Sequence, residues 1–357
     1  MPSLHATLMA MNCDPQHGNF ADEFSQWTTD ILGEPYQAAV LELGNDPDHE
    51  TDIAATLVRV DPTSDLAQSA ENSDFNSPKP ALLWIHGMSD YFFQRHVGEK
   101  FAADGYGFYA IDLRKCGRSL RPGQRAHHIT NLDYYFEELS AAVDKIANDG
   151  YQTIVPVAHS TGGLIAALWL NYLRRHDQQR FSHIAGLALN SPWLDLQLPQ
   201  PKRTAARIIA PLATKFRPDV LTPDDGLGGY GESIHKDHHG AWDFDVKLKP
   251  IAGHEKVWSW LNAILQGQKQ IRKGIDTGVP TLVMHSSGSL LDQPYRAELD
   301  TVDAVLDTDQ IARRTKNLGS KAFNVVIPQA LHDVFLSEDY PRRQAFEVTE
   351  EFLHSLR

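Results

Sequence analysis

The residue of this chain best placed for chemistry is Ser160. It lies in Ala158-His-Ser-Thr-Gly-Gly163, between an apolar run typical of a buried strand and an apolar pattern with helical spacing. This order predicts a strand, a sharp turn and a helix, with the serine hydroxyl raised at the turn. Small residues must flank such a serine, because strand and helix approach closely there. Gly162 meets this need, and Ala158 stands where the pattern G-x-S-x-G has its first glycine. We therefore expect Ser160 to be a nucleophile and not only a helix cap.

A serine hydroxyl is a weak nucleophile at neutral pH, so it needs a base within hydrogen-bond reach, which a carboxylate in turn orients. On an α/β sheet the three residues follow one another as serine, acid and histidine. His332 lies in a loop after the apolar run at 322–327, which predicts a strand. The chain holds 17 histidines, and His332 is the one whose place in this order best suits the base.

Two aspartates compete for the place of the acid. Both follow the apolar run at 280–285, which predicts a strand, and both precede the candidate base. Asp303 lies just before a predicted helix at 307–318, while Asp292 lies nearer to the strand end. Asp307 suits the N-cap of that helix. We expect Asp303 to be the acid and keep Asp292 as the alternative.

An acyl transfer also needs hydrogen-bond donors for the oxyanion of its tetrahedral intermediate. The backbone N–H of Thr161, at the start of the predicted helix, is one candidate. The other is the N–H of Met88, because His86 and Gly87 end another apolar run. Gly87 permits the backbone conformation that would direct this amide inward.

The elements that must position these residues are strands alternating with helices. This alternation predicts a mostly parallel sheet with helices on both faces. Before it, runs at 36–43 and 52–60 predict a hairpin. The alternation is interrupted between residues 197 and 278. The expected organisation is an N-terminal arm at 1–34, an α/β core formed by 35–196 and 279–357, and an inserted cap at 197–278.

The insertion contains an apolar helical segment at 257–265. Ligands of open α/β sheets bind beyond the carboxyl ends of the strands, and a cap inserted there would cover them. We expect Trp193, Leu194, Trp260 and Leu261 to form an acyl pocket under this cap. The alternative is that the tryptophans only pack the cap onto the core.

Composition excludes several classes of function. The formal net charge is −13 and the pI about 5.7, which disfavours binding to nucleic acid and general attraction to anionic membranes. Hydrophobic residues make up 42% and charged residues 22%, values typical of a globular protein, and no apolar run is long enough to span a membrane. Two cysteines and no signal-peptide pattern predict a cytoplasmic protein.

No cofactor or metal is expected. His235, His238 and His239 lie close together, but no neighbouring cysteine or supporting pattern accompanies them, so zinc is not predicted. Cys116 has no matched base in its loop and is expected to be structural.

Five segments together resemble the α/β-hydrolase superfamily. Within it the chain looks most similar to the group of monoacylglycerol lipases, lysophospholipases and serine aminopeptidases of the S33 type. The segments are Ile85-His-Gly-Met-Ser-Asp-Tyr91, Asp112-Leu-Arg-Lys-Cys-Gly-Arg-Ser119, Ala158-His-Ser-Thr-Gly-Gly163, Asp303-Ala-Val-Leu-Asp307 and Leu331-His332. The resemblance spans residues 35–357 and is weakest in the insertion.

This resemblance implies an eight-stranded sheet with a cap over the active site. It also implies roles for five residues: Ser160 as nucleophile, Asp303 as acid, His332 as base, and the amides of Met88 and Thr161 as oxyanion donors. The chain departs from the group in two places. Ala158 replaces the first glycine of the turn, and the stretch at 286–302 is longer than the group's usual spacing between strand and acid.

The leading hypothesis is a serine hydrolase that cleaves carboxylic esters through a Ser-His-Asp triad and an acyl-enzyme. Its substrate would be a small-molecule, lipid-like ester with a single chain, of the monoacylglycerol or lysophospholipid type. A serine aminopeptidase or amidase on the same triad is the first alternative. It would need an acidic anchor for a free amine, for which Glu232, Asp243, Asp245 and Glu255 are available. The second alternative is a protein of the same fold that binds a small ligand without catalysis.

Overall fold

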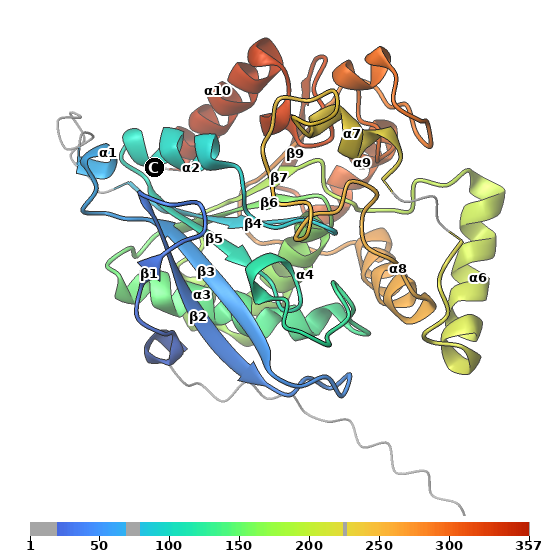
Figure 1. Ribbon diagram of the computed structural model, residues 1–357, viewed down its shortest axis with the longest axis horizontal. Coiled ribbons are helices and arrows are strands. Elements are labelled where there is room, and N and C mark those ends of the chain that lie inside the picture. Colours follow the sequence, from blue (N-terminus) through green and yellow to red (C-terminus); the bar gives the residue numbers. More distant parts are fainter. Residues whose placement is uncertain (1–19, 69–78, 224–226, 357) are drawn as a thin grey trace, which may run out of the picture.

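The residues that the computed structural model describes, 20–68, 79–223 and 227–356, are arranged around a nine-stranded sheet (Figure 1). Its order is β1-β2-β3-β5-β4-β6-β7-β8-β9. The strands are β1 (Thr28–Thr29), β2 (Tyr36–Gly44), β3 (Ile53–Val60), β4 (Ala81–Ile85), β5 (Gly107–Asp112), β6 (Ile154–His159), β7 (Leu187–Asn190), β8 (Thr281–Ser286) and β9 (Ala322–Ile327). Strands β1 to β3 pair antiparallel, as do β3 and β5, and the other neighbours are parallel.

Helices cover both faces of the sheet, because successive side chains of its buried strands point to opposite sides. In β4, Leu82 and Trp84 belong to the cluster under α2 and α10, and Leu83 and Ile85 to the cluster under α3 and α4. Figure 1 shows these two layers above and below the sheet. The helices of the first face are α2 (Arg95–Ala103) and α10 (Asp339–Ser355), and those of the second are α3 (Phe136–Asn148), α4 (Thr161–His176) and α9 (Thr308–Thr315).

The predicted insertion lies between β7 and β8 and carries three helices, α6 (Gln200–Phe216), α7 (Gly229–Ile234) and α8 (Trp258–Lys273). Helix α8 packs on α4, and α6 packs on α8 and lies outermost (Figure 1). Helix α7 packs elsewhere, in an aromatic cluster that Tyr91 and Phe93 share. Helices α1 (Asp65–Gln68) and α5 (Gln178–Phe181) are single turns.

The predicted fold class is confirmed, with one more strand than expected. The additional strand is β1, which lies in the predicted N-terminal arm and pairs with Gln37 and Ala38 of β2. Two threonines carry no alternation of polar and apolar residues, so periodicity could not reveal this strand. Tyr91, Phe92 and Phe93 are buried in the segment that precedes α2.

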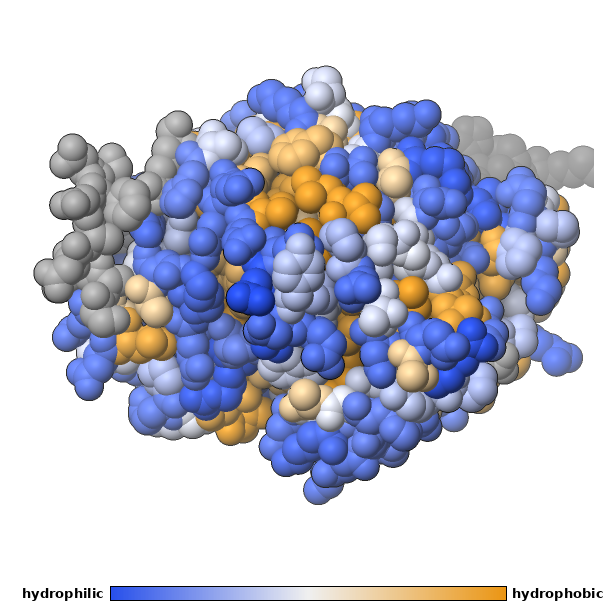
Figure 2. Space-filling view, turned by 90° about the horizontal axis from the view of Figure 1, so that it is seen from above, coloured by the Kyte–Doolittle hydropathy of each residue, from blue (hydrophilic) through white to orange (hydrophobic). Residues whose placement is uncertain are grey.

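On the face shown in Figure 2, hydrophilic side chains predominate and hydrophobic ones form separate patches. No helix among the described residues is long and apolar enough to cross a bilayer.

Candidate active site

Ser160 lies at the sharp turn between β6 and α4, with φ 52° and ψ −117°. A residue with a side chain rarely adopts this conformation, which costs about 1–3 kcal/mol and persists only where the surroundings enforce it. Two hydrogen bonds do so. The Ser160 N–H donates to the carbonyl of Asn190 at 3.0 Å, and its carbonyl accepts from the N–H of Trp193 at 2.9 Å. The turn therefore holds the serine at the carboxyl end of the sheet.

Glycines at two positions allow the backbones around Ser160 to approach one another. A Cβ at Gly162 would lie 2.3 Å from the carbonyl oxygen of His86, and a Cβ at Gly87 would lie 3.0 Å from the Cβ of Ser160. Neither position has room for a side chain. Ala158, in contrast, lies within β6, fully buried and opposite Ile85 and Leu189, so its methyl group fits where the usual pattern has glycine.

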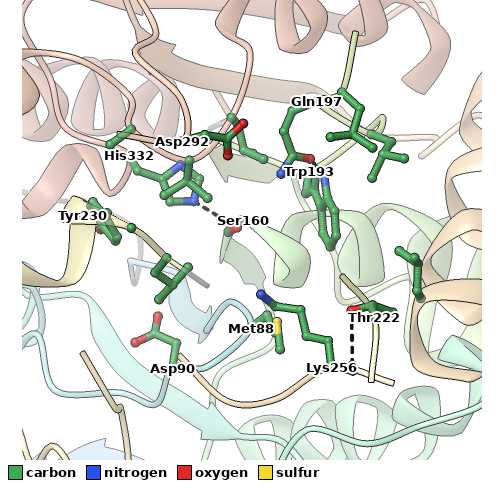
Figure 3. Close-up of a pocket in the computed structure, with 18 of the residues that line it drawn as sticks. Met88, Asp90, Ser160, Trp193, Gln197, Thr222, Tyr230, Lys256, Asp292 and His332 are labelled. Carbon is green, nitrogen blue, oxygen red and sulfur yellow. Dashed lines mark hydrogen bonds between the residues drawn. The ribbon is translucent and has the colours of Figure 1, made fainter. Parts of the chain in front are cut away.

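The structure brings Ser160, His332 and Asp303 into one chain of hydrogen bonds. Nε2 of His332 lies 3.0 Å from Oγ of Ser160, and its Nδ1 lies 2.9 Å from Oδ2 of Asp303. Asp303 is fully buried, while Ser160 keeps 8% of its surface exposed, at the wall of a cavity. Figure 3 shows the serine and the histidine facing each other at this wall. The arrangement can transfer a proton from the hydroxyl to the imidazole and stabilise the resulting cation.

Backbone contacts of Asp303 explain why the stretch between β8 and this residue, 286–302, can be long. Its N–H donates to the carbonyl of Gly288 and its carbonyl accepts from the N–H of Leu290, both at 2.9 Å. The chain thus leaves the sheet after β8, forms a loop, and returns to pair beside its own starting point. The second carboxylate oxygen, Oδ1, accepts from the amides of Val305 and Leu306 at 2.8 and 2.7 Å. The carboxylate is therefore fixed from both sides.

The other aspartates take different places. Asp307 caps α9 by accepting from the N–H of Gln310, as predicted. Asp292 lies in the cavity wall (Figure 3), and among the described residues it forms no hydrogen bond with His332.

Sequence reasoning missed a buried network behind His332. The carboxylate of Asp333 accepts from the side-chain amides of Asn190 and Gln94 at 2.7 and 3.0 Å. Asn190 also accepts from the N–H of Val334 at 3.1 Å. This network fixes the loop that carries the histidine. The sequence could have indicated Asn190 by its position, because it ends a strand whose carboxyl end faces the site.

Burial and ion pairing set the protonation states of the titratable side chains around the site. Burial lowers the pKa of His159 to about 4, so the ring that packs 4.7 Å from that of His332 is neutral. Asp90 forms a buried ion pair with Lys249 at 2.9 Å. Burial is the largest influence and opposes ionisation of Asp90, but the charge and hydrogen bond of Lys249, together with the neighbouring histidines, hold the pKa of Asp90 below its usual value.

A cavity of about 450 Å³ opens beside Ser160. Three of the four predicted pocket residues, Trp193, Trp260 and Leu261, line it. The expectation for Leu194 was wrong: it is absent from the lining and belongs to the buried core, with 1% of its surface exposed. In the irregular segment after β7 the Leu194 N–H donates to the carbonyl of Pro192 at 3.0 Å, and Leu194 turns inward where Trp193 faces the cavity.

The predicted oxyanion donors lie on either side of Ser160. Met88 follows the glycine that packs against the serine and lines the cavity, and Thr161 is the first residue of α4. In the part of the chain that the structure describes, neither amide donates to a backbone carbonyl. Both N–H groups are thus available to an oxygen atom of a substrate.

The remaining candidates have structural contacts. Nε2 of His235 lies 3.2 Å from the carbonyl of Phe244, and the ring of His239 stacks on Tyr295. No group of three or more potential ligands among the described residues could hold a metal ion. Cys116 is buried with its Sγ 3.2 Å from Nδ1 of His127, and burial raises the pKa of its thiol well above the usual value.

Comparison with known proteins identifies similar chains. The family model described as serine aminopeptidase, S33, matches residues 76–339. Phospholipase YtpA of Bacillus subtilis is 31% identical over 122 residues, which cover 34% of this chain and 43% of the relative. The matches to curated relatives span less than half of the relatives' own length.

Solved structures resemble the chain over most of its length. A soluble variant of monoglyceride lipase from Saccharomyces cerevisiae, in complex with a substrate analog, has a TM-score of 0.58 at 17% identity and covers 93% of this chain and 94% of its own. Monoacylglycerol lipase of Paleococcus ferrophilus has a TM-score of 0.55 at 17% identity and covers 78% and 96%. At such identities the likeness shows the fold, which is that of α/β-hydrolases.

The contacts of the two aspartates generate a prediction. Asp303→Asn should lower kcat for an ester substrate by about 10⁴-fold, because the amide no longer orients and stabilises the imidazole. Asp292→Asn serves as the matched control and should change kcat by less than about threefold. Steady-state kinetics of both purified, folded variants would contradict the assignment of Asp303 if the two effects were exchanged.

Proposed function

The chain belongs to the serine aminopeptidase S33 family of α/β-hydrolases. Within this family, we propose that it is a serine hydrolase that cleaves carboxylic esters. One observation carries the proposal: the hydrogen-bonded series of Asp303, His332 and Ser160 at the wall of an open cavity. The likeness to lipase structures and to a phospholipase supports it.

The reaction follows from the geometry of these groups. As Oγ of Ser160 attacks the ester carbonyl, Nε2 of His332 takes its proton, and Asp303 stabilises the imidazolium through Nδ1–H. The amides of Met88 and Thr161 donate to the oxyanion. His332 then returns the proton to the leaving alcohol, and an acyl-enzyme remains on Ser160. Water, activated by the same imidazole, releases the acid and restores the serine.

The cavity supports a lipid-like ester with a single chain as substrate. Its wall on the side of α6 and α8 is apolar, with Trp193, Leu196, Leu198, Trp260 and Leu261. The segment at 197–278 would then act as the cap that covers this acyl pocket. Polar groups, among them the ion pair of Asp90 and Lys249, line another part of the wall and suit the alcohol or head group of the substrate.

The two alternatives have less support. An aminopeptidase needs a carboxylate to bind the free amine, and none of Glu232, Asp243, Asp245 and Glu255 is among the residues that line this cavity. Two carboxylates among the described residues line it, Asp90 and Asp292, and because Asp90 is paired with Lys249, Asp292 is the one of the two that could take this role. A ligand-binding protein without catalysis has no need of the complete hydrogen-bonded series. A cytoplasmic location stays a prediction from the sequence.

The choice between ester and amide is directly testable. We expect p-nitrophenyl esters to be hydrolysed with a kcat/KM at least about 100-fold above that of amino-acid p-nitroanilides. The reason is that the cavity has an apolar wall, and none of the four carboxylates expected to bind a free amine lines it. Ser160→Ala should abolish turnover of both, since only binding and oxyanion effects remain. Preferred cleavage of anilides would instead establish the aminopeptidase.

The cap generates a second prediction. Each methylene of an acyl chain that the apolar wall buries contributes about 0.8 kcal/mol, so kcat/KM should rise roughly fourfold per methylene until the pocket is full. Trp260→Ala or Leu261→Ala should flatten this dependence and change turnover of acetate esters less.

The control for this series is Phe323→Ala, which removes an exposed ring on β9, away from the cavity wall. It should leave the dependence on chain length unchanged. An equal loss for all chain lengths in the folded Trp260 and Leu261 variants would mean that the cap is only structural, and lipid-like esters would no longer be the favoured substrates.

A further inference from the structure

Exposed hydrophobic side chains gather on α6 and the turn that follows it. Phe216 keeps 73% of its surface exposed and Ile208 62%, although most large apolar residues of the chain are buried. Six of the exposed large hydrophobic side chains belong to this segment: Ile208, Ile209, Leu212, Phe216, Val220 and Leu221. Their concentration in one short segment marks an interaction surface.

The apolar side chains of α6 share one face. At about 100° per residue, Ile208, Ile209, Leu212 and Phe216 occupy about a quarter of the helix circumference. The opposite side of the helix is occupied, since Ala210 is buried in a cluster with Leu196 and Leu265. Helix α6 is thus an amphipathic helix in which one apolar side covers the protein and the other faces outward (Figure 1).

The charge of this segment is opposite to that of the whole protein. Residues 200–221, which include the turn, contain five lysines and arginines and one aspartate, Asp219, whereas the chain has a net charge of −13. Asp219 forms an ion pair with Arg125. Arg203 and Arg207 turn inward and lie 3.8 and 2.7 Å from Asp195. Lys202 and Lys215 are exposed and lie at the two edges of the apolar face on the helix circumference. Within the described part of the chain, no ion pair neutralises these two lysines.

The outward face of α6 points away from the side of the helix that lines the cavity, since at about 100° per residue its centre lies about 110° from Ala206. Ala206 of α6 lines the cavity, as do Leu198 before the helix and Thr222 after it. A surface seated against the outer face of α6 would therefore lie beside the cavity wall.

We propose that α6 and the following turn dock in the plane of an anionic lipid bilayer. Ile208, Leu212 and Phe216 enter the boundary between head groups and acyl chains, and Lys202 and Lys215 contact the phosphates, as is typical of an interfacial helix with cations beside its apolar face. A second copy of the chain packed through the same face is the less favourable occupant, because it would bring the exposed Lys202 and Lys215 of two chains together, whereas lipid phosphates neutralise them. This proposal concerns binding and does not depend on the proposed hydrolysis.

The test is sedimentation of the full chain with vesicles of phosphatidylcholine alone or with about 30% phosphatidylglycerol. We expect binding to the anionic vesicles that weakens with salt. Lys202→Gln with Lys215→Gln should weaken it by about 25-fold, which is about fivefold for each cation. Leu212→Ser with Phe216→Ser should weaken binding at least about tenfold, because binding strength scales with the buried apolar area.

The matched control is Val326→Ser with Phe323→Ser, which removes one aliphatic and one aromatic side chain from β9. These two side chains are exposed over 45% and 46% of their surface. It should bind as the unchanged chain does, and so should Ser160→Ala, which separates docking from hydrolysis. Absence of vesicle binding, or an equal loss in the β9 control, would overturn the proposal. It would also be overturned if the α6 substitutions converted a dimer into a monomer without affecting vesicle binding.

Discussion

The close approach of three backbone segments at Ser160 is the constraint on which the site depends. The end of β4, the turn after β6 and the start of α4 meet where Gly87 and Gly162 have no side chains. This packing forces Ser160 into a conformation that costs about 1–3 kcal/mol. The hydrogen bonds of its backbone to Asn190 and Trp193 offset that cost, at about 1 kcal/mol each. The strained backbone of Ser160 is thus stabilised by its contacts with neighbouring segments.

The other parts of the site follow from the direction of the strands. Parallel strands bring their carboxyl ends to one edge of the sheet, so the loops after β4, β6, β7, β8 and β9 meet there. Those loops and strand ends carry Met88, Ser160, Asn190, Asp303 and His332. The insertion after β7 extends from the same edge, which is why α6 and α8 can form one wall of the cavity. Through α6 the same insertion also reaches the outer surface, so a docked helix and an acyl pocket would share one element.

Local patterns predicted the elements and the principal polar residues, because they depend on neighbours in the sequence. Continuous apolar runs identified the buried strands, and chain order indicated Ser160 and His332. Asp303 was preferred to Asp292 for its place just before a predicted helix. Interactions between distant segments could not be predicted in this way. The pairing of Asp303 with Gly288 and Leu290 requires a loop to return to its origin. Asp90 meets Lys249, and Asn190 meets Asp333, across long separations in the chain. The inward direction of Leu194 depends on the course of an irregular segment after β7.

The central claim is that the environment of Ser160 makes its hydroxyl a nucleophile. Labelling of the native chain with a fluorophosphonate, followed by mass spectrometry of the digested protein, tests it most directly. The account predicts one phosphonyl group per chain, attached to Ser160, and loss of labelling when the fold is denatured beforehand. An unlabelled Ser160 in the folded protein, or a label on another residue in its place, would contradict it.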